Sequence, residues 1–337
     1  MLLSRRNFLL TGFTLLLLSG KRRKPYAITV NGPIEADQLG FSLIHEHILV
    51  DFIGADKTNY SRWNRDEVVK KVLPYLLEAK EAGVTSFFDC TPAFLGRDVQ
   101  LLKVLSEQSG LQIITNTGYY GAVNKKYLPS WAFTETAEQL ATRWIKEFEH
   151  GIENTSIKPG FIKISVDAEE PLTEVDAKLV RAAALTHLKT GLTICSHTGP
   201  AKAAFAQLEI LEKEKVRPDA FVWVHAKAEP DKSNHIKAAK MGAWVSLDGI
   251  GWGDFDNYAD SIVLLKNAGL LGRVLLSHDA GWYKPDEKEG GEFTGYTNIF
   301  KELMPRLKNE GFTKADFNLL FVRNPQNALS IYIRKEL

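Results

Sequence analysis

The sequence predicts an α/β protein with a single (β/α)8 TIM barrel over residues 26–337, on three observations. Eight short apolar runs alternate with longer amphipathic stretches, which is typical of a parallel sheet with helical crossovers. No glycine-rich turn of the dinucleotide-binding type follows the first strand, so a doubly wound open sheet is disfavoured. No repeat or low-complexity linker divides this region, which favours one domain.

The predicted elements follow one another in regular strand and helix pairs. The strands are expected at residues 42–50, 84–89, 112–117, 161–166, 193–197, 221–225, 243–248 and 274–277. The helices are expected at residues 66–82, 98–109, 134–149, 174–190, 202–215, 235–241, 257–268 and 298–309. Glycines such as Gly110 and Gly191 directly follow predicted helices, as expected for helix ends.

Composition limits the class of function. The chain has 337 residues, of which 45% are hydrophobic and 25% charged, as in an ordinary globular protein. A net charge of +1 argues against a nucleic-acid-binding surface and favours a small-molecule substrate. The two cysteines, Cys90 and Cys195, fall in strand-like segments, so we expect buried thiols rather than a disulfide framework.

Residues 1–25 resemble a twin-arginine export signal. Arg5 and Arg6 precede an apolar run at residues 8–18, which is shorter than the roughly 20 residues of a membrane span. We therefore expect an exported, periplasmic protein whose membrane contact is confined to this segment. The alternative is an accidental basic N-terminus or an uncleaved anchor, since no clear small-x-small cleavage site precedes Lys21.

Unusual polar residues stand on the first and fourth predicted strands. Alternation along the first strand places His45 and His47 on one face, inside the barrel. Lys163 lies between apolar residues on the fourth strand, where burial disfavours the charged ammonium. A neutral amine can add carbon dioxide to form a carbamate that bridges two metals. A Schiff-base lysine and a lysine that extends out of the barrel are the alternatives.

Three further ligand-type residues end later strands. His197 and His225 are the last residues of the fifth and sixth predicted strands, and Asp279 follows the eighth. Because the carboxyl ends of barrel strands share one mouth, these side chains should converge with His45, His47 and Lys163. Imidazole and carboxylate ligands suit zinc, and manganese, cobalt and iron accept the same donors.

These residues and their neighbours resemble the phosphotriesterase family, including its lactonases, of the amidohydrolase superfamily. The resemblance covers about residues 27–330, and its motifs are residues 28–34, residues 39–47, the isolated Lys163 strand, His197-Thr198-Gly199, residues 277–282 and Asn324-Pro325. It implies that His45, His47 and Asp279 bind a more buried divalent metal, and that His197 and His225 bind a more exposed one. Lys163, as N6-carboxylysine, would bridge the two. A homodimer is also implied.

The resemblance implies a hydrolase in which a metal-bridging hydroxide attacks a carbonyl or phosphoryl centre and the catalytic Asp279 receives its proton. The best-studied phosphotriesterases pass that proton onward through a histidine after strand seven and an aspartate after strand six. Here the corresponding places are Asp248-Gly249 and residues 226–229. Whether Asp248 or Glu229 replaces the relay is left open.

This departure favours lactones or carboxylic esters as substrates. The alternatives are a phosphotriester hydrolase and a catalytically weak metal-containing binding protein. Two aromatic residues at the expected mouth, Tyr120 and Trp252, are the predicted substrate contacts. Three other histidines, His150, His187 and His235, fall in helical patterns and are expected at the surface.

Overall fold

The computed structural model describes residues 25–336. The predicted export signal lies outside these residues except for Pro25, and the division of the chain at residue 26 stays a prediction. Within the described region, no helix has both the length and the apolar character needed to cross a membrane.

The strands of the structure reproduce the predicted series with small shifts at their ends. Their bounds are β1 Tyr26–Thr29, β2 Gly32–Glu35, β3 Ser42–Leu49, β4 Ser86–Asp89, β5 Gln112–Ile114, β6 Asn116–Thr117, β7 Phe161–Ser165, β8 Ile194–His197, β9 Phe221–Val224, β10 Trp244–Leu247, β11 Val274–Leu276 and β12 Gly281–Tyr283. The hairpin β1–β2 and the short strand β12 were not among the predicted strands.

The strands close into a parallel barrel. Two parallel sheets have the orders β11-β10-β9-β8-β7-β6 and β12-β3-β4-β5. Only Thr115 separates β5 from β6, so the third predicted strand joins both sheets. On the other side, Asp279 N donates to His45 O at 3.0 Å, which ties the segment after β11 to β3. The barrel prediction is confirmed.

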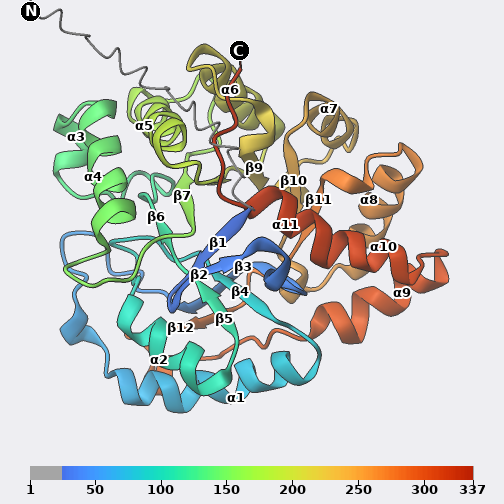
Figure 1. Ribbon diagram of the computed structural model, residues 1–337, viewed down its shortest axis with the longest axis horizontal. Helices are drawn as coiled ribbons and strands as arrows, with labels where there is room; N and C mark the ends of the chain where they lie inside the picture. Colours follow the sequence, from blue (N-terminus) through green and yellow to red (C-terminus); the bar gives the residue numbers. More distant parts are fainter. Residues whose placement is uncertain (1–24, 337) are drawn as a thin grey trace, which may run out of the picture.

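Helices surround the strands as an outer ring (Figure 1). Their bounds are α1 Arg65–Glu81, α2 Val99–Ser109, α3 Trp131–Thr134, α4 Ala137–His150, α5 Glu174–Thr190, α6 Ala201–Lys213, α7 Ser233–Met241, α8 Phe255–Asn267, α9 Met304–Asn309, α10 Lys314–Asn318 and α11 Asn324–Leu329. The predicted helix at 134–149 corresponds to α4 and starts three residues later, at Ala137, because Thr136 and Gln139 form a capping box there. The predicted helix at 298–309 begins as a π-helical turn before α9.

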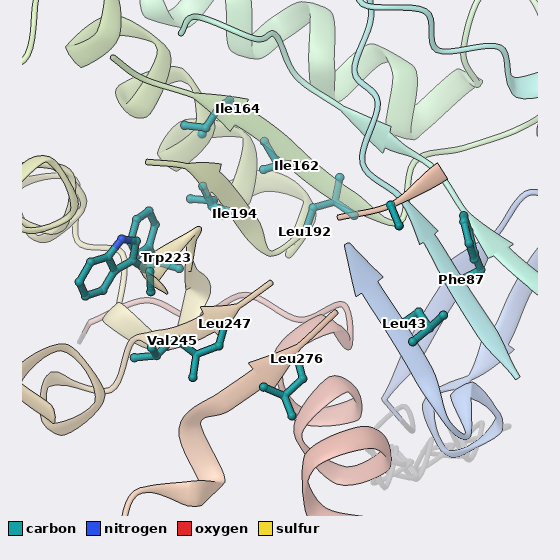
Figure 2. Close-up of a cluster of buried hydrophobic side chains, with 14 of the residues drawn as sticks. Leu43, Phe87, Ile162, Ile164, Leu192, Ile194, Trp223, Val245, Leu247 and Leu276 are labelled. Atoms are coloured by element: carbon teal, nitrogen blue, oxygen red, sulfur yellow. The ribbon is translucent and has the colours of Figure 1, made fainter. Parts of the chain in front are cut away.

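Alternation along the strands separates two apolar layers. Outward-facing side chains such as Ile162, Ile194 and Val245 pack in the shell between strands and helices, part of which Figure 2 shows. Inward-facing side chains such as Phe161 and Val222 form a second cluster inside the barrel. The polar residues predicted for the site occur on the same inward face, so they rest on a solid apolar layer.

A β-bulge in β3 adjusts which side chains face inward. The pairing of β3 with β4 shifts register between Leu43 and Glu46. As a result, Ile44 joins the interior apolar cluster, while the next residue, His45, also lines the interior pocket described below. Simple alternation alone would have placed neighbouring residues on opposite faces.

Two of the three histidines expected at the surface are buried. His150 is exposed, but His187 and His235 are almost completely covered. The His187 ring contacts Leu192 O through Nδ1 at 2.9 Å, and Arg334 N donates to its Nε2 at 2.9 Å. The prediction was wrong for these two because a helical pattern does not reveal backbone groups from other segments that satisfy a buried ring.

Glu46 fastens the closing edge of the barrel. Its fully buried carboxylate accepts hydrogen bonds from Ser277 Oγ, His278 N, His278 Nδ1 and Ala280 N at 2.7–3.0 Å. Because Ile299 N donates to His278 Nε2, the proton of that ring is on Nδ1, pointing at Glu46. Glu46 therefore fixes the backbone on both sides of Asp279.

We expect Glu46→Gln to lower the free energy of unfolding by about 2–3 kcal/mol. In glutamine an NH2 group replaces one carboxylate oxygen, and where it faces the Ala280 N–H it cannot accept that hydrogen bond. Urea titration of both proteins measures this difference. Glu81→Gln, on the exposed end of α1, is the matched control and should change stability by less than about 0.5 kcal/mol. Equal effects of the two substitutions would contradict the role given to Glu46.

Candidate metal centre

All six predicted metal ligands line a single pocket at the carboxyl ends of the strands. His45 and His47 come from β3, Lys163 from β7, and His197 from the end of β8. His225 directly follows β9, and Asp279 is the third residue after β11. The remaining wall consists mainly of apolar and aromatic side chains, namely Val50, Phe52, Leu95, Tyr120, Val123, Tyr127 and Trp282.

One compact group of donors is formed by His45, His47 and Asp279, whose ligand atoms lie within 4.8 Å of one another. Asp279 Oδ1 is 3.2 Å from His47 Nε2 and 3.6 Å from His45 Nε2. Burial alone would raise the pKa of Asp279, but the neighbouring imidazoles hold that pKa well below its ordinary value. Asp279 is therefore an ionised carboxylate facing two imidazole nitrogens.

A second group of donors, His197 and His225, lies beside the first group in the same pocket. The rings of His197 and His225 are 4.3 Å apart between centroids, and those of His45 and His225 are 5.0 Å apart. Burial lowers the pKa of His45 to about 4, and burial together with the charge on His225 lowers the pKa of His197. At neutral pH both His45 and His197 are thus neutral rings, the form that binds metals.

Asp248 connects the two groups from behind. Its Oδ1 is 2.7 Å from His225 Nδ1, and its Oδ2 is 3.1 Å from His45 Nδ1. Ser246 Oγ and His225 N also donate to this carboxylate, which is fully buried. An ionised carboxylate only accepts, so a proton on each Nδ1 suits these contacts, and each imidazole then turns its Nε2 toward the pocket. One carboxylate therefore orients one predicted ligand of each metal.

His47 has its own supporting contact. Its Nδ1 lies 2.8 Å from Thr91 Oγ1, which again leaves Nε2 for the pocket. Thr91 follows β4, and neither it nor the orienting contacts of Asp248 were predicted. The sequence signal for both is a polar residue just past a strand end, a pattern too common to assign a role without the fold.

The backbone is strained at two of these positions. Asp279 and His225 are not glycines, yet their φ angles are +51° and +60°, in the left-handed region. Close approach adds to this near Gly281, where a Cβ atom would lie 1.8 Å from His47 O. Left-handed residues directly after a strand turn their side chains back over the barrel mouth. The strain is therefore part of how these ligands converge.

Lys163 is the most unusual member of the pocket. Its side chain is buried, and its Nζ lies 3.1 Å from His45 Nε2. Among the described residues, no carboxylate lies within ion-pair distance of this nitrogen. A buried amine without a direct ion pair, surrounded by metal-binding donors, fits a lysine that takes part in metal binding. Two groups of donors among the described residues could hold a metal ion, namely His45 with His47 and Asp279, and His45 with His225 and Asp248.

Neither candidate for the missing proton relay is free to act as one. Asp248 is occupied by His45 and His225. Glu229 does not line the pocket: its Oε2 accepts from Ala201 N at the start of α6, and its Oε1 accepts from Asp231 N. Within residues 25–336, the pocket thus contains no onward acceptor in the relay positions.

The two predicted substrate contacts lie in different places relative to the pocket. Tyr120 lines the pocket, with its hydroxyl 3.1 Å from His197 Nδ1. Trp252 is not part of the wall: it is 60% exposed, donates to Asp279 O, and packs its ring against Trp282. Trp282 takes the place in the wall that sequence reasoning gave to Trp252, because β12 returns the chain against β3.

We expect Asp248→Asn to weaken metal binding about 10- to 100-fold, because the amide group cannot accept from both imidazole Nδ1–H groups. Bound metal can be measured per chain after dialysis against graded chelator buffers. Asp260→Asn, on the exposed face of α8, is the control with the same charge change. An Asp248→Asn protein that holds its metals as tightly as the control would refute the orienting role.

Comparison with known proteins places this geometry in a family. Residues 26–329 match the model of the phosphotriesterase family. The chain is 28% identical to a phosphotriesterase homology protein of Escherichia coli, with coverage of 86% of this chain and 97% of that protein. It is also 28% identical to an aryldialkylphosphatase of Saccharolobus solfataricus, with coverage of 88% and 97%. An N-acetyltaurine hydrolase of Rattus norvegicus is 27% identical, with coverage of 93% and 99%. The chain therefore belongs to the phosphotriesterase family of metal-dependent hydrolases.

Proposed function

We propose that this protein hydrolyses neutral lactones or carboxylic esters with two divalent cations, preferably zinc, held by the six predicted ligands. The observation that carries this proposal is the composition of the pocket: beyond the six ligands its wall is aromatic and aliphatic. Among the described wall residues, Lys163 is the only lysine or arginine. Such a wall favours an uncharged substrate with an apolar substituent.

The bound cations would supply Lewis-acid activation of water and of the scissile carbonyl. His45, His47 and Asp279 would hold one cation, and His197 and His225 the other. Lys163 would bridge them after its neutral amine adds carbon dioxide, which forms an N–C bond and releases one proton. Carboxylation replaces a buried, unpaired amine with an anion that two cations neutralise.

The residues around the reacting centre have separate tasks. Asp279 is ionised and can accept a proton at its carboxylate. Tyr120 directs its hydroxyl into the pocket beside His197, where it can donate to a substrate oxygen. The apolar wall excludes water from the substituent of the substrate. Export by the twin-arginine route stays part of the proposal, supported by Arg5 and Arg6 ahead of the apolar residues 8–18.

Phosphotriester hydrolysis is the second candidate, favoured by the neutral wall and by the relative named aryldialkylphosphatase. The empty relay positions count against it. Relatives named N-acetyltaurine hydrolase suggest a carboxylic amide, but the described wall offers no cation besides Lys163 for a sulfonate. That these relatives are named as hydrolases favours an enzyme over a binding protein.

We expect the metal-loaded protein to hydrolyse a lactone or aryl ester with a kcat/KM at least about 10² above that for a matched phosphotriester, the order of magnitude of a missing proton-transfer group. The assay compares lactones, esters, phosphotriesters and N-acetyltaurine on one preparation. Higher activity on phosphotriesters or on N-acetyltaurine would replace the proposed substrate class. Loss of all activity in Asp279→Asn is the check that turnover belongs to this site.

Lys163→Ala should reduce metal content from about two per chain to one or fewer, with partial recovery when a short carboxylic acid is added to replace the carbamate. Elemental analysis measures the metals, and mass spectrometry under non-denaturing conditions detects the added carbon dioxide. Lys202→Ala, exposed on α6, should leave both unchanged. Wild-type protein that binds fewer than one metal after careful loading would remove the two-metal proposal.

A further inference from the structure

A strained turn forms one side of the pocket. Val123, Asn124 and Lys125 have φ angles of +61°, +54° and +63°, three consecutive left-handed residues of which none is glycine. Left-handed backbone is unfavourable for any residue that has a Cβ atom, so a run of three persists only where surrounding contacts determine it. The contacts that hold this turn are therefore worth identifying individually.

Lys125 supplies the main contact. Its Nζ lies 2.6 Å from Asp167 Oδ2 and 2.7 Å from Asp176 Oδ2. Asp167 follows β7, the strand that carries Lys163, and Asp176 is in the first turn of α5. The Asp176 side chain is fully buried and also accepts from Thr173 Oγ1. Because an unpaired buried carboxylate is costly, Lys125 is held in place by the charge that it neutralises.

Other contacts leave little room for the turn to move. Gly121 N and Ala122 N donate to Ser165 O and Ser165 Oγ on β7. A Cβ atom at Gly121 would lie 2.5 Å from Leu179 of α5, so the backbone packs tightly on that helix. On the other side, Ala55 N donates to Lys126 O. The turn is thus fixed between β7, α5 and the loop after β3.

The turn presents an apolar side chain to the pocket. Val123 lines the pocket although 51% of its surface is exposed, and Tyr127, four residues on, is a buried part of the same wall. An exposed valine on a strained turn gains nothing in the free protein from its position. It would gain by covering an apolar group of a bound substrate.

We propose that Lys125 is a positioning residue. Together with Asp167 and Asp176 it holds the left-handed turn, and the turn places Val123 in the pocket wall. There Val123 selects among substrates by their apolar substituent. This inference rests on the proposed function and adds the determinant of substrate selectivity. Lys125 itself is not among the residues that line the pocket. Its removal alters the shape of the pocket while the six ligands stay in place.

The first measurement follows the turn directly. Lys125→Met keeps the length of the side chain but removes its charge, and amide hydrogen exchange over residues 121–128 should become at least about tenfold faster. Lys125→Arg should retain wild-type exchange because it keeps the charge between the two carboxylates. Lys178→Met is the matched control on α5, where Lys178 binds only the carbonyl of Phe133 among the described residues. Bound metal should be equal in all of these proteins.

The second measurement follows selectivity. γ-Lactones with alkyl substituents of increasing length are compared by kcat/KM, and the corresponding lactams are compared by calorimetric binding, which needs no turnover. Lys125→Met should change the ratio between long and short substituents by about tenfold, mainly through KM. Val123→Ala should favour longer substituents and Val123→Phe shorter ones, while the contacts of Lys125 with Asp167 and Asp176 stay intact.

The results separate the two proposals. Faster hydrogen exchange in Lys125→Met, together with a changed kcat/KM ratio between long and short substituents, supports the positioning of Val123 by Lys125. Unchanged exchange, or an unchanged ratio in Lys125→Met and in both Val123 variants, overturns it. If no lactone or ester is hydrolysed by any protein, the proposed function fails, and lactam binding and hydrogen exchange still decide whether Lys125 controls the wall.

Discussion

Closure of the barrel between β3 and the segment after β11 is the constraint on which the site depends. The backbone bond from Asp279 N to His45 O brings the last predicted ligand against the first two. Glu46 secures the same edge with four hydrogen bonds. If this edge opened, Asp279 would move away from both imidazoles, and neither the donor group nor the pocket would remain. Closure of this edge therefore contributes to the geometry of the site as well as to the stability of the fold.

A second level of order comes from Asp248. A metal site of six ligands from five segments requires each imidazole to present the correct nitrogen, and hydrogen bonds to the opposite nitrogen decide this. Asp248 does so for His45 and His225 together. The two predicted metal positions are therefore coupled through this carboxylate. This also explains why Asp248 is unavailable to carry a proton away from Asp279.

The sequence predicted the barrel and the convergence of all six ligand-type residues, because strand periodicity and the common direction of parallel strands determine both. It could not predict the bulge in β3 or the burial of His187 and His235, which depend on neighbours distant in the chain. The pocket walls were predicted only in part: Tyr120 lies in the wall, whereas Trp282 stands where Trp252 was expected. Most wall residues come from loops, and Trp282 comes from the short strand β12; the periodicity of the main strands and helices does not specify the paths of these segments.

The separation of ligands and walls has a consequence for how this enzyme can diverge. The ligands stand on strands or within three residues of a strand end, on an apolar layer inside the barrel. Wall residues such as Val123 and Tyr127 lie in turns beyond the strand ends. Substitutions in those turns can alter substrate range while the reaction chemistry is inherited unchanged. New activities can therefore arise by small steps, with each intermediate still an active hydrolase.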